Sequence, residues 1–250
     1  MSGSGARRVG RAGAGLTAAS ALLLFLAFLP VPTPHLVWVA LVPWLLHVER
    51  GMRDGAATRA AARSGAGLFA LFWGLHLSWV LVLAPRLGAL WPLWAYAGQV
   101  LLLALLGAVA GAGIHQFRVQ AGVPLPLAAA AGWVAVEWLR GHLLGPLRFP
   151  WSPVALPLAD LPDWVQPAAW VGESGLGAGV LAVNGVVALA WVRRAEAGAL
   201  RWRPSRPALL AVAAHGNRLL SSLLGYAPML TPGKLRELRQ PDWLADNAAF

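Results

Sequence analysis

The segment Glu137–Trp151, with the sequence EWLRGHLLGPLRFPW, places a carboxylate, two arginines and a Phe-Pro-Trp corner between two very apolar segments. The apolar segment that it closes covers residues 125–144, and the next one covers residues 167–192. Each is close to the roughly 20 apolar residues that a helix needs to cross the hydrocarbon core of a bilayer. The segment therefore predicts a membrane–water interface within an α-helical membrane protein.

The composition of the 250 residues points to the same class of protein. Hydrophobic residues make up 58% and charged residues 12%, with 14 tryptophans against two tyrosines. A soluble domain carries about twice that charged fraction. The net charge of +10 comes from arginines in short loops between apolar runs, which is typical of orientation in a bilayer. The composition predicts an integral membrane protein with no nucleic-acid partner.

Motifs for cofactors and metals are weak or missing in the sequence. The chain has no cysteine, which excludes disulfides, thiolate metal sites and thiol nucleophiles. The histidines show no pair at helical spacing and no acidic cluster, and Gly10, Gly13 and Gly15 lack the preceding strand of a dinucleotide-binding loop. We expect no metal and no cofactor. The glycines within residues 107–113 and 172–179 favour helix–helix packing instead.

The apolar pattern predicts an all-α polytopic transmembrane helix bundle of about six spans. The expected spans are residues 13–30, 36–48, 65–84, 90–114, 125–144 and 167–192. The first two share a Pro-rich turn, and the second is short, so this pair can form a hairpin that does not cross at full depth. An apolar segment follows the first span directly, which favours an uncleaved span over a signal peptide.

Arginine counts predict the orientation of the bundle. With a cytoplasmic N-terminus, thirteen arginines fall in inside loops and three, Arg86, Arg140 and Arg148, in outside loops. Cytoplasmic loops are enriched in arginine, so we expect cytoplasmic N- and C-termini and an outer position for Glu137–Trp151. Six tryptophans are expected near the same outer interface, namely Trp91, Trp94, Trp138, Trp151, Trp164 and Trp170.

Changes in hydropathy and charge along the chain predict three regions. Residues 1–12 form a basic cytoplasmic N-terminus, residues 13–206 a transmembrane domain, and residues 207–250 a short cytoplasmic tail of different origin. The tail begins with an apolar run, residues 207–214, that is too short to span a bilayer.

Glu137 and Arg140 lie three residues apart on one helix face, so they can pair. This pair is either a structural ion pair at the interface or a pair that binds a headgroup or anchors a loop. Glu173 is expected in the first turn of the sixth span, where a helix favours negative charge. Asn184 is expected to bond to a neighbouring helix.

The Phe149-Pro150-Trp151 corner has two interpretations. Pro150 biases Phe149 toward extended geometry, and the two aromatic rings can insert at the acyl boundary. The corner either ends a helix and anchors a loop, or forms part of a surface that meets lipid. His76 is expected to be the histidine at membrane depth, with a hydrogen-bonded structural role favoured over a proton relay.

These residues together resemble a known family. The order VEWLRG at 136–141, FPW at 149–151 and GES at 172–174 resembles the membrane domain of bacterial apolipoprotein N-acyltransferases. The segments FWGLHLSWVLV at 72–82 and WVALVPWLL at 38–46 are similar to the third and second spans of that family. The resemblance covers about residues 15–207.

The resemblance implies a substrate class and a location. Members of this family move an acyl chain from a phospholipid to the N-terminal amino group of a diacylglyceryl lipoprotein, at the bacterial cytoplasmic (inner) membrane. They act through a cysteine thioester, with Glu and Lys, in a nitrilase-like domain outside the membrane. The implied substrate-contact or loop-positioning residues are Trp79, Glu137, Arg140, Phe149, Pro150, Trp151 and Glu173.

No catalytic residue is carried over from the family. The chain has no cysteine and a single lysine, and the resemblance does not reach a nitrilase-like domain. We therefore expect a catalytically incomplete membrane domain. A non-catalytic lipid-binding or scaffold membrane protein, arising from truncation or fusion, is the alternative. A transporter is disfavoured because few ionisable residues are expected near the membrane and no repeat is evident.

The tail is similar to a different family. The sequence PMLTPGKLRELRQPDWLADN at 228–247 resembles the C-terminal region of extended short-chain dehydrogenases of the NAD-dependent epimerase type. Their nucleotide-binding and Tyr-Lys catalytic elements are not included, so the resemblance implies no redox activity. A gene fusion, a frameshift or an assembly artefact is the expected origin of this tail.

Overall fold

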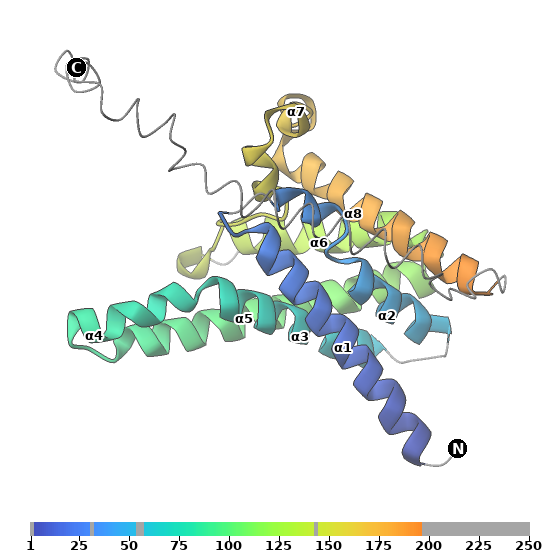
Figure 1. The fold of residues 1–250 in the computed structure, drawn as a ribbon, viewed down its shortest axis with the longest axis horizontal. Helices are drawn as coiled ribbons and strands as arrows, with labels where there is room; N and C mark the ends of the chain where they lie inside the picture. Colours follow the sequence, from blue (N-terminus) through green and yellow to red (C-terminus); the bar gives the residue numbers. More distant parts are fainter. Residues whose placement is uncertain (1–2, 31–32, 54–57, 143–144, 197–250) are drawn as a thin grey trace, which may run out of the picture. The chain divides into compact units, whose positions relative to one another are not determined.

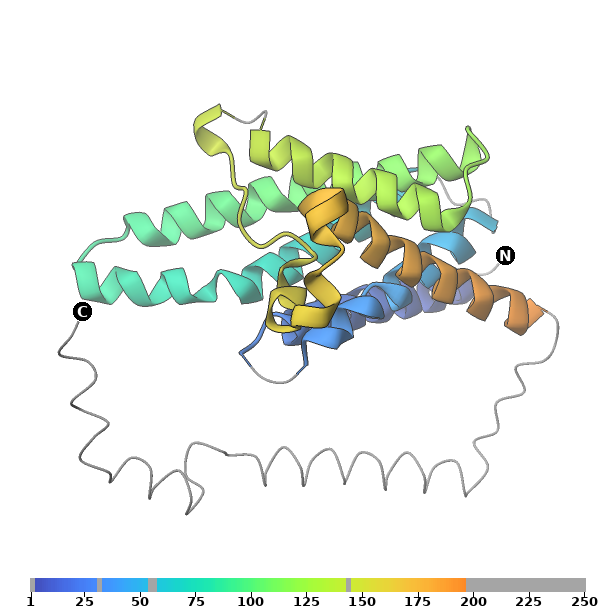
Figure 2. The same ribbon diagram turned by 90° about the horizontal axis from the view of Figure 1, so that it is seen from above.

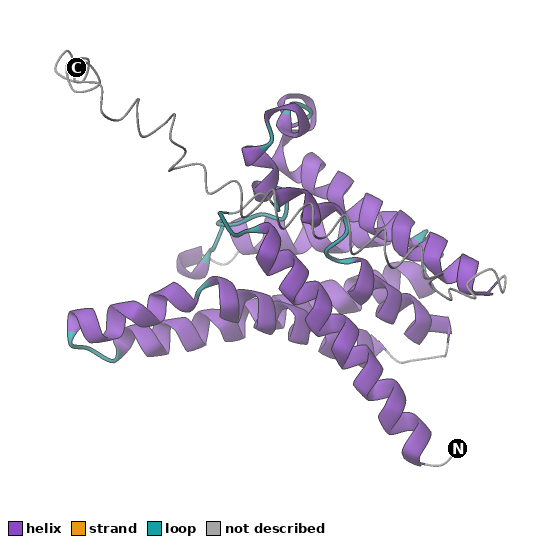
Figure 3. Ribbon diagram, in the orientation of Figure 1, coloured by secondary structure: helices purple, strands orange, loops and turns teal. Residues whose placement is uncertain are grey.

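The structure, a computed structural model, describes residues 3–30, 33–53, 58–142 and 145–196. Its α-helices are α1 (Gly3–Ala27), α2 (Val42–Arg53), α3 (Thr58–His76), α4 (Leu83–Leu87), α5 (Trp91–Val119), α6 (Leu125–His142), α7 (Pro162–Val165) and α8 (Ala168–Glu196) (Figure 1). The 3-10 helices are η1 (Pro34–Trp38), η2 (Ser78–Val82), η3 (Gly145–Leu147) and η4 (Leu156–Asp160). No strand occurs in these residues, as Figure 3 shows, which confirms the all-α class. The predicted tail and its start at residue 207 lie outside the described residues.

Two helices are long and apolar enough to cross a membrane individually. They are α5 and α8, each of 29 residues, in which an 18-residue window has a mean hydropathy of 2.0 and 1.9, respectively. A third crossing is available if α3 and the η2–α4 segment, bent by 45°, form one span. Helix α2 has only 12 residues, and α6 carries Glu137 and Arg140. The structure therefore supports a helical membrane protein, while six spans remain a prediction.

The prediction of one continuous helix over residues 36–48 is wrong. The chain leaves η1, turns, and begins α2 only at Val42. The buried side chain of Asn184 on α8 fills the break, because its Nδ2 donates to the Val37 carbonyl at 2.9 Å and its Oδ1 accepts the Leu41 N–H at 2.8 Å. Backbone groups freed from a helix in an apolar environment need such partners. The prediction that Asn184 bonds to a neighbouring element is confirmed.

The third predicted span, residues 65–84, is also displaced. Helix α3 begins earlier, at Thr58, because the Ala- and Arg-rich residues before the apolar run are good helix formers. The helix ends at His76, and the chain bends into η2 and α4 before Gly88, in a left-handed conformation at φ 59°, turns it into α5. Helices α3, α4 and α5 thus form the long hairpin visible in Figures 1 and 2.

Helix α8 contains an interruption near its start. Gly172 has φ 69° and ψ 178°, a backbone conformation accessible essentially only to glycine. Glu173 therefore opens the regular part of α8, in agreement with its predicted place in a first helical turn. The helix continues to Glu196, beyond the predicted end at residue 192.

Glycines bring α3 and α5 into backbone contact. A Cβ atom added to Gly107 would lie 2.4 Å from the Gly65 carbonyl oxygen, and one added to Gly111 would lie 2.3 Å from the Ala61 carbonyl oxygen. This confirms the packing role predicted for Gly107 and Gly111, because small residues let membrane helices approach closely. Gly113 instead has no atom within 4 Å of an added Cβ.

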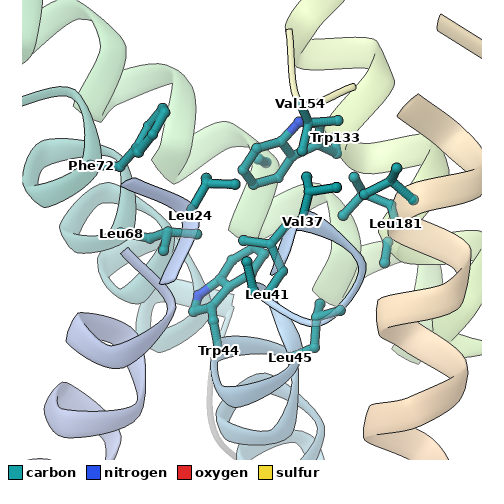
Figure 4. Close-up of a cluster of buried hydrophobic side chains, with 14 of the residues drawn as sticks. Leu24, Val37, Leu41, Trp44, Leu45, Leu68, Phe72, Trp133, Val154 and Leu181 are labelled. Atoms are coloured by element: carbon teal, nitrogen blue, oxygen red, sulfur yellow. The ribbon is translucent and has the colours of Figure 1, made fainter. Parts of the chain in front are cut away.

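The hydrophobic core is formed by side chains of α1, α2, α3, α5, α6 and α8. Trp44 of α2 is fully buried and lies 6.3 Å from the ring of Trp133 on α6. Leu24, Leu68 and Leu181 surround this pair (Figure 4). The core thus fixes α6, whose last turns carry Glu137 and Arg140.

We predict that Gly107→Ala destabilises the protein and that Gly113→Ala does not. The new methyl group at residue 107 must displace the Gly65 backbone, so we expect a loss of about 1–3 kcal/mol. At residue 113, the higher helix propensity of alanine should leave stability unchanged or raise it by at most about 1 kcal/mol. Thermal unfolding in detergent, followed by circular dichroism, measures both variants. Equal changes for the two would contradict the close contact of α3 with α5.

Candidate functional site

The site is built on the end of α6, where Arg140 holds the Phe-Pro-Trp corner. The side chain of Arg140 is only 3% exposed. Its Nη1 donates to the carbonyl oxygens of Phe149 at 2.7 Å and Trp151 at 2.5 Å, and its Nη2 donates to that of Ser152 at 3.2 Å. The backbone carbonyl of Arg140 in turn accepts the Phe149 N–H at 2.7 Å. One buried guanidinium therefore fixes the path of residues 149–152.

Glu137 fixes the next part of the same loop. Its Oε1 accepts hydrogen bonds from the Val154 N–H at 2.7 Å and from the Trp133 Nε1–H at 2.9 Å. The same oxygen lies 3.8 Å from Arg140 Nη2, so the predicted ion pair is confirmed. Of the two interpretations of this pair, the geometry supports loop anchoring. The pair holds residues 149–154, which we call the corner loop.

The end of α3 provides a second support for the corner loop. The guanidinium of Arg140 lies over the Trp73 ring, with 5.2 Å between Cζ and the ring centroid, which is within the range of a cation–π contact. The half-buried ring of Phe149 meets Trp73 edge-on at 5.5 Å. His76 Nε2 and Ser152 Oγ are 2.9 Å apart. Ser152 has φ 52°, a value that is uncommon for a residue other than glycine.

A small cavity of about 10 Å³ lies behind the corner loop. Glu137, Arg140 and Ser152 line one side of it, and Trp73 and Trp133 are among its apolar walls. This volume has room for about one water molecule and not for a phospholipid headgroup. The space behind the corner loop is therefore too small to hold a headgroup.

Exposed side chains occupy the outer side of the corner loop. Trp151 is 62% exposed, and Pro150 is also exposed. The exposed Glu173 is close enough to Glu137 and Arg140 to interact with both electrostatically. Trp79, at 53% exposure, lies on η2, and among the described residues no ring contact joins it to the corner loop. Six of the seven candidate residues thus lie at or next to the corner loop, and the seventh, Trp79, lies apart from them on the α3–α5 hairpin.

The sequence analysis missed several partners in this site. Trp133 precedes Glu137 by four residues, and this helical spacing could have indicated their hydrogen bond. No sequence signal marks Ser152, because its role depends on a backbone turn. His76 is hydrogen-bonded, as predicted, and its position at membrane depth stays a prediction. His115 is buried, and its Nδ1 lies 3.1 Å from Thr58 Oγ1.

The sequence analysis also missed a second buried carboxylate, that of Glu49, which lies near the C-terminal end of α2. Glu49 is 1% exposed and accepts hydrogen bonds from Arg118 at 2.9 and 3.1 Å and from Arg53 at 3.2 Å. The i, i+4 spacing of Glu49 and Arg53 was a readable signal for this pair. No group of three or more His, Asp or Glu side chains in the described residues is arranged to hold a metal ion.

We predict that Arg140→Met opens the corner loop and that Arg148→Met does not. Loss of the guanidinium removes three charge-assisted hydrogen bonds, each worth about 1.5–3 kcal/mol. The amides of Phe149 and Val154 should therefore exchange with deuterium on the order of tenfold or more faster. Hydrogen exchange with mass spectrometry measures this, and the exposed Arg148 provides the matched control. Unchanged exchange in Arg140→Met would show that the loop is held by other contacts.

Comparisons with known proteins match the part of the chain that contains this site. The family model described as apolipoprotein N-acyltransferase N-terminal domain matches residues 20–186. The apolipoprotein N-acyltransferase of Gloeobacter violaceus (strain ATCC 29082 / PCC 7421) is 34% identical over 180 residues, which are 68% of this chain and 33% of that protein. The chain therefore spans about a third of that relative's length. No solved structure matches. The chain belongs to the family of apolipoprotein N-acyltransferase N-terminal domains.

Proposed function

We propose that this chain serves as the membrane domain of an apolipoprotein N-acyltransferase and presents the corner loop to a phospholipid. The observation that carries the proposal is the Glu137–Arg140 clamp, which holds the backbone of residues 149–154 while Trp151 remains exposed. A fixed loop with an exposed indole suits a membrane interface, where the ring lies at headgroup depth. The donor in this proposal is a phospholipid, and the acceptor is a diacylglyceryl lipoprotein.

The orientation in this proposal places the corner loop on the outer side of the bacterial inner membrane. The chain crosses about six times, with cytoplasmic N- and C-termini. The arginine distribution supports this, since the exposed Arg50, Arg59 and Arg63 lie at helix ends away from the corner loop. Exposed tryptophans near the proposed outer interface also support it, namely Trp91, Trp94, Trp138, Trp151, Trp164 and Trp170.

Residues 1–250 are proposed to be catalytically incomplete by themselves. Acyl transfer through a thioester needs a thiolate nucleophile, and this sequence contains no cysteine. Arg140 and Glu137 are not proposed as catalytic groups, because their hydrogen bonds are directed to the corner loop. Their proposed role is to position the loop and, through it, the lipid.

The alternative function is that of a non-catalytic lipid-binding or scaffold membrane protein. The absence of cysteine from these 250 residues favours it. The proposed dehydrogenase-like origin of residues 228–247 belongs to this alternative. Both functions use the corner loop as a lipid-facing surface, and they differ in whether acyl transfer takes place.

We predict that the purified 250-residue chain transfers no acyl group. In phospholipid vesicles with a labelled donor lipid and a diacylglyceryl peptide, labelled product should stay at the level of protein-free vesicles, because the thioester route has no thiol. The full-length Gloeobacter relative, assayed in the same vesicles, serves as the positive control. Turnover by the 250-residue chain above background would refute its proposed incompleteness.

We predict that Trp151→Ala reduces contact with phospholipid much more than Trp191→Ala does. Both tryptophans are exposed, so neither change should strongly affect stability. Only Trp151 belongs to the corner loop. A phospholipid with a photoreactive headgroup should cross-link to residues 145–166 at least about fivefold less in Trp151→Ala, in line with the loss of one interfacial indole. Equal yields at these residues in the two variants would remove the special role of the corner loop.

A further inference from the structure

The helix ends opposite the corner loop form one surface rich in arginine. It is built from the ends of α2, α5 and α8 and the start of α3, which Figure 1 shows on the same side of the helices. Glu49 links α2 to Arg118 of α5, and Arg53 pairs with Glu196 of α8. This arginine surface comprises Arg50, Arg53, Arg59, Arg63, Arg118, Arg193 and Arg194.

The acidic side chains that the structure describes at this surface, Glu49 and Glu196, are already paired with arginines of the protein. Glu49 is buried beneath Arg53 and Arg118, and Glu196 pairs with Arg53. The other five arginines make no ion pair within the described residues, and all five are exposed. Buried Glu49 therefore joins the ends of α2 and α5, while the five exposed arginines carry positive charge that no acidic side chain among the described residues pairs with.

Apolar side chains surround these charges. Phe117 and Val119 on α5 and Val187 and Trp191 on α8 are exposed at the same helix ends. Exposed aromatic and aliphatic side chains next to arginines are typical of the level at which acyl chains meet headgroups. A nucleic acid or an acidic protein in water would not match the apolar part of this surface. The charge and the apolar belt together fit a phospholipid.

We infer that the arginine surface binds the headgroups of anionic phospholipids in the cytoplasmic leaflet. A guanidinium can donate two parallel hydrogen bonds to one phosphate, which favours arginine over lysine for this contact. Each basic side chain near an anionic membrane surface strengthens binding by about fivefold. This inference concerns the end of the bundle away from the corner loop and does not depend on acyl transfer.

The experiment compares phospholipids bound to the full chain. Nanodiscs with equal amounts of phosphatidylglycerol and phosphatidylcholine are dissolved in mild detergent, and the lipids that remain on the protein are counted by native mass spectrometry. Wild-type protein should retain phosphatidylglycerol preferentially, and this preference should fall as salt is raised, because exposed charges are screened. The triple variant Arg50→Gln, Arg59→Gln, Arg63→Gln should lose at least about tenfold of the preference.

Three controls separate headgroup binding from folding and orientation. The triple Arg→Lys variant at residues 50, 59 and 63 keeps the charge and should retain more of the preference than the triple Gln variant. Arg86→Gln, on α4 at the tip of the α3–α5 hairpin far from the arginine surface, should match wild type. Because the natural chain has no cysteine, single cysteines labelled with an impermeant maleimide in cells verify the topology of each variant.

Several results would overturn the inference. These are no preference for phosphatidylglycerol in the wild type, a preference that salt does not reduce, or an unchanged preference in a correctly oriented triple Gln variant. An equal loss in Arg86→Gln would show a general charge effect instead of a defined surface. Displacement of the lipid by soluble glycerophosphoglycerol alone would indicate an anion site and not a lipid surface.

Discussion

A guanidinium that is withdrawn from water needs several hydrogen-bond acceptors, because an unpaired buried charge is strongly destabilising. Arg140 meets this requirement with three acceptors of one loop, the carbonyl groups of Phe149, Trp151 and Ser152. Glu137 supplies the opposite charge and takes the Val154 N–H. The charge is therefore compensated only when the loop occupies one position. This constraint converts a polar pair on α6 into a fixed platform for Trp151.

The same physical rule operates at two other places in the bundle. Where the chain breaks between η1 and α2, the side-chain amide of Asn184 replaces the missing helical partners of Val37 and Leu41. At the arginine surface, Glu49 is buried only because two arginines bond to it. In both cases, the buried polar group is tolerated because its hydrogen bonds are satisfied. The partners belong to segments that are distant in the sequence. Polar residues thus determine how the apolar helices are arranged.

Apolar periodicity and residue type indicated much of this arrangement before the structure. The all-α class, the Glu137–Arg140 pair and a packing role for Gly107 and Gly111 follow from spacing along a helix, and the family follows from the order of short motifs. Helix ends were less predictable. Residues 36–48 are apolar except for His47, yet they do not form one helix, because Asn184 stabilises the break from 143 residues away. An apolar run therefore predicts that residues are buried more reliably than it predicts that they form one continuous helix.

The sequence by itself determined which residues are chemically costly in an apolar environment, and thus that Glu137, Arg140 and Asn184 require partners. Only the tertiary structure decided which partners these are. The carbonyl groups of the corner loop, the ring of Trp73 and the hydroxyl of Ser152 come together through the ends of α3 and α6. Every residue has a backbone carbonyl, so residue type does not indicate which carbonyl groups accept these hydrogen bonds. The φ of 52° at Ser152 arises only when the corner loop is in its folded position. For that reason, the pair and loop anchoring as one of its possible roles could be predicted from the sequence, and the backbone groups that it holds could not.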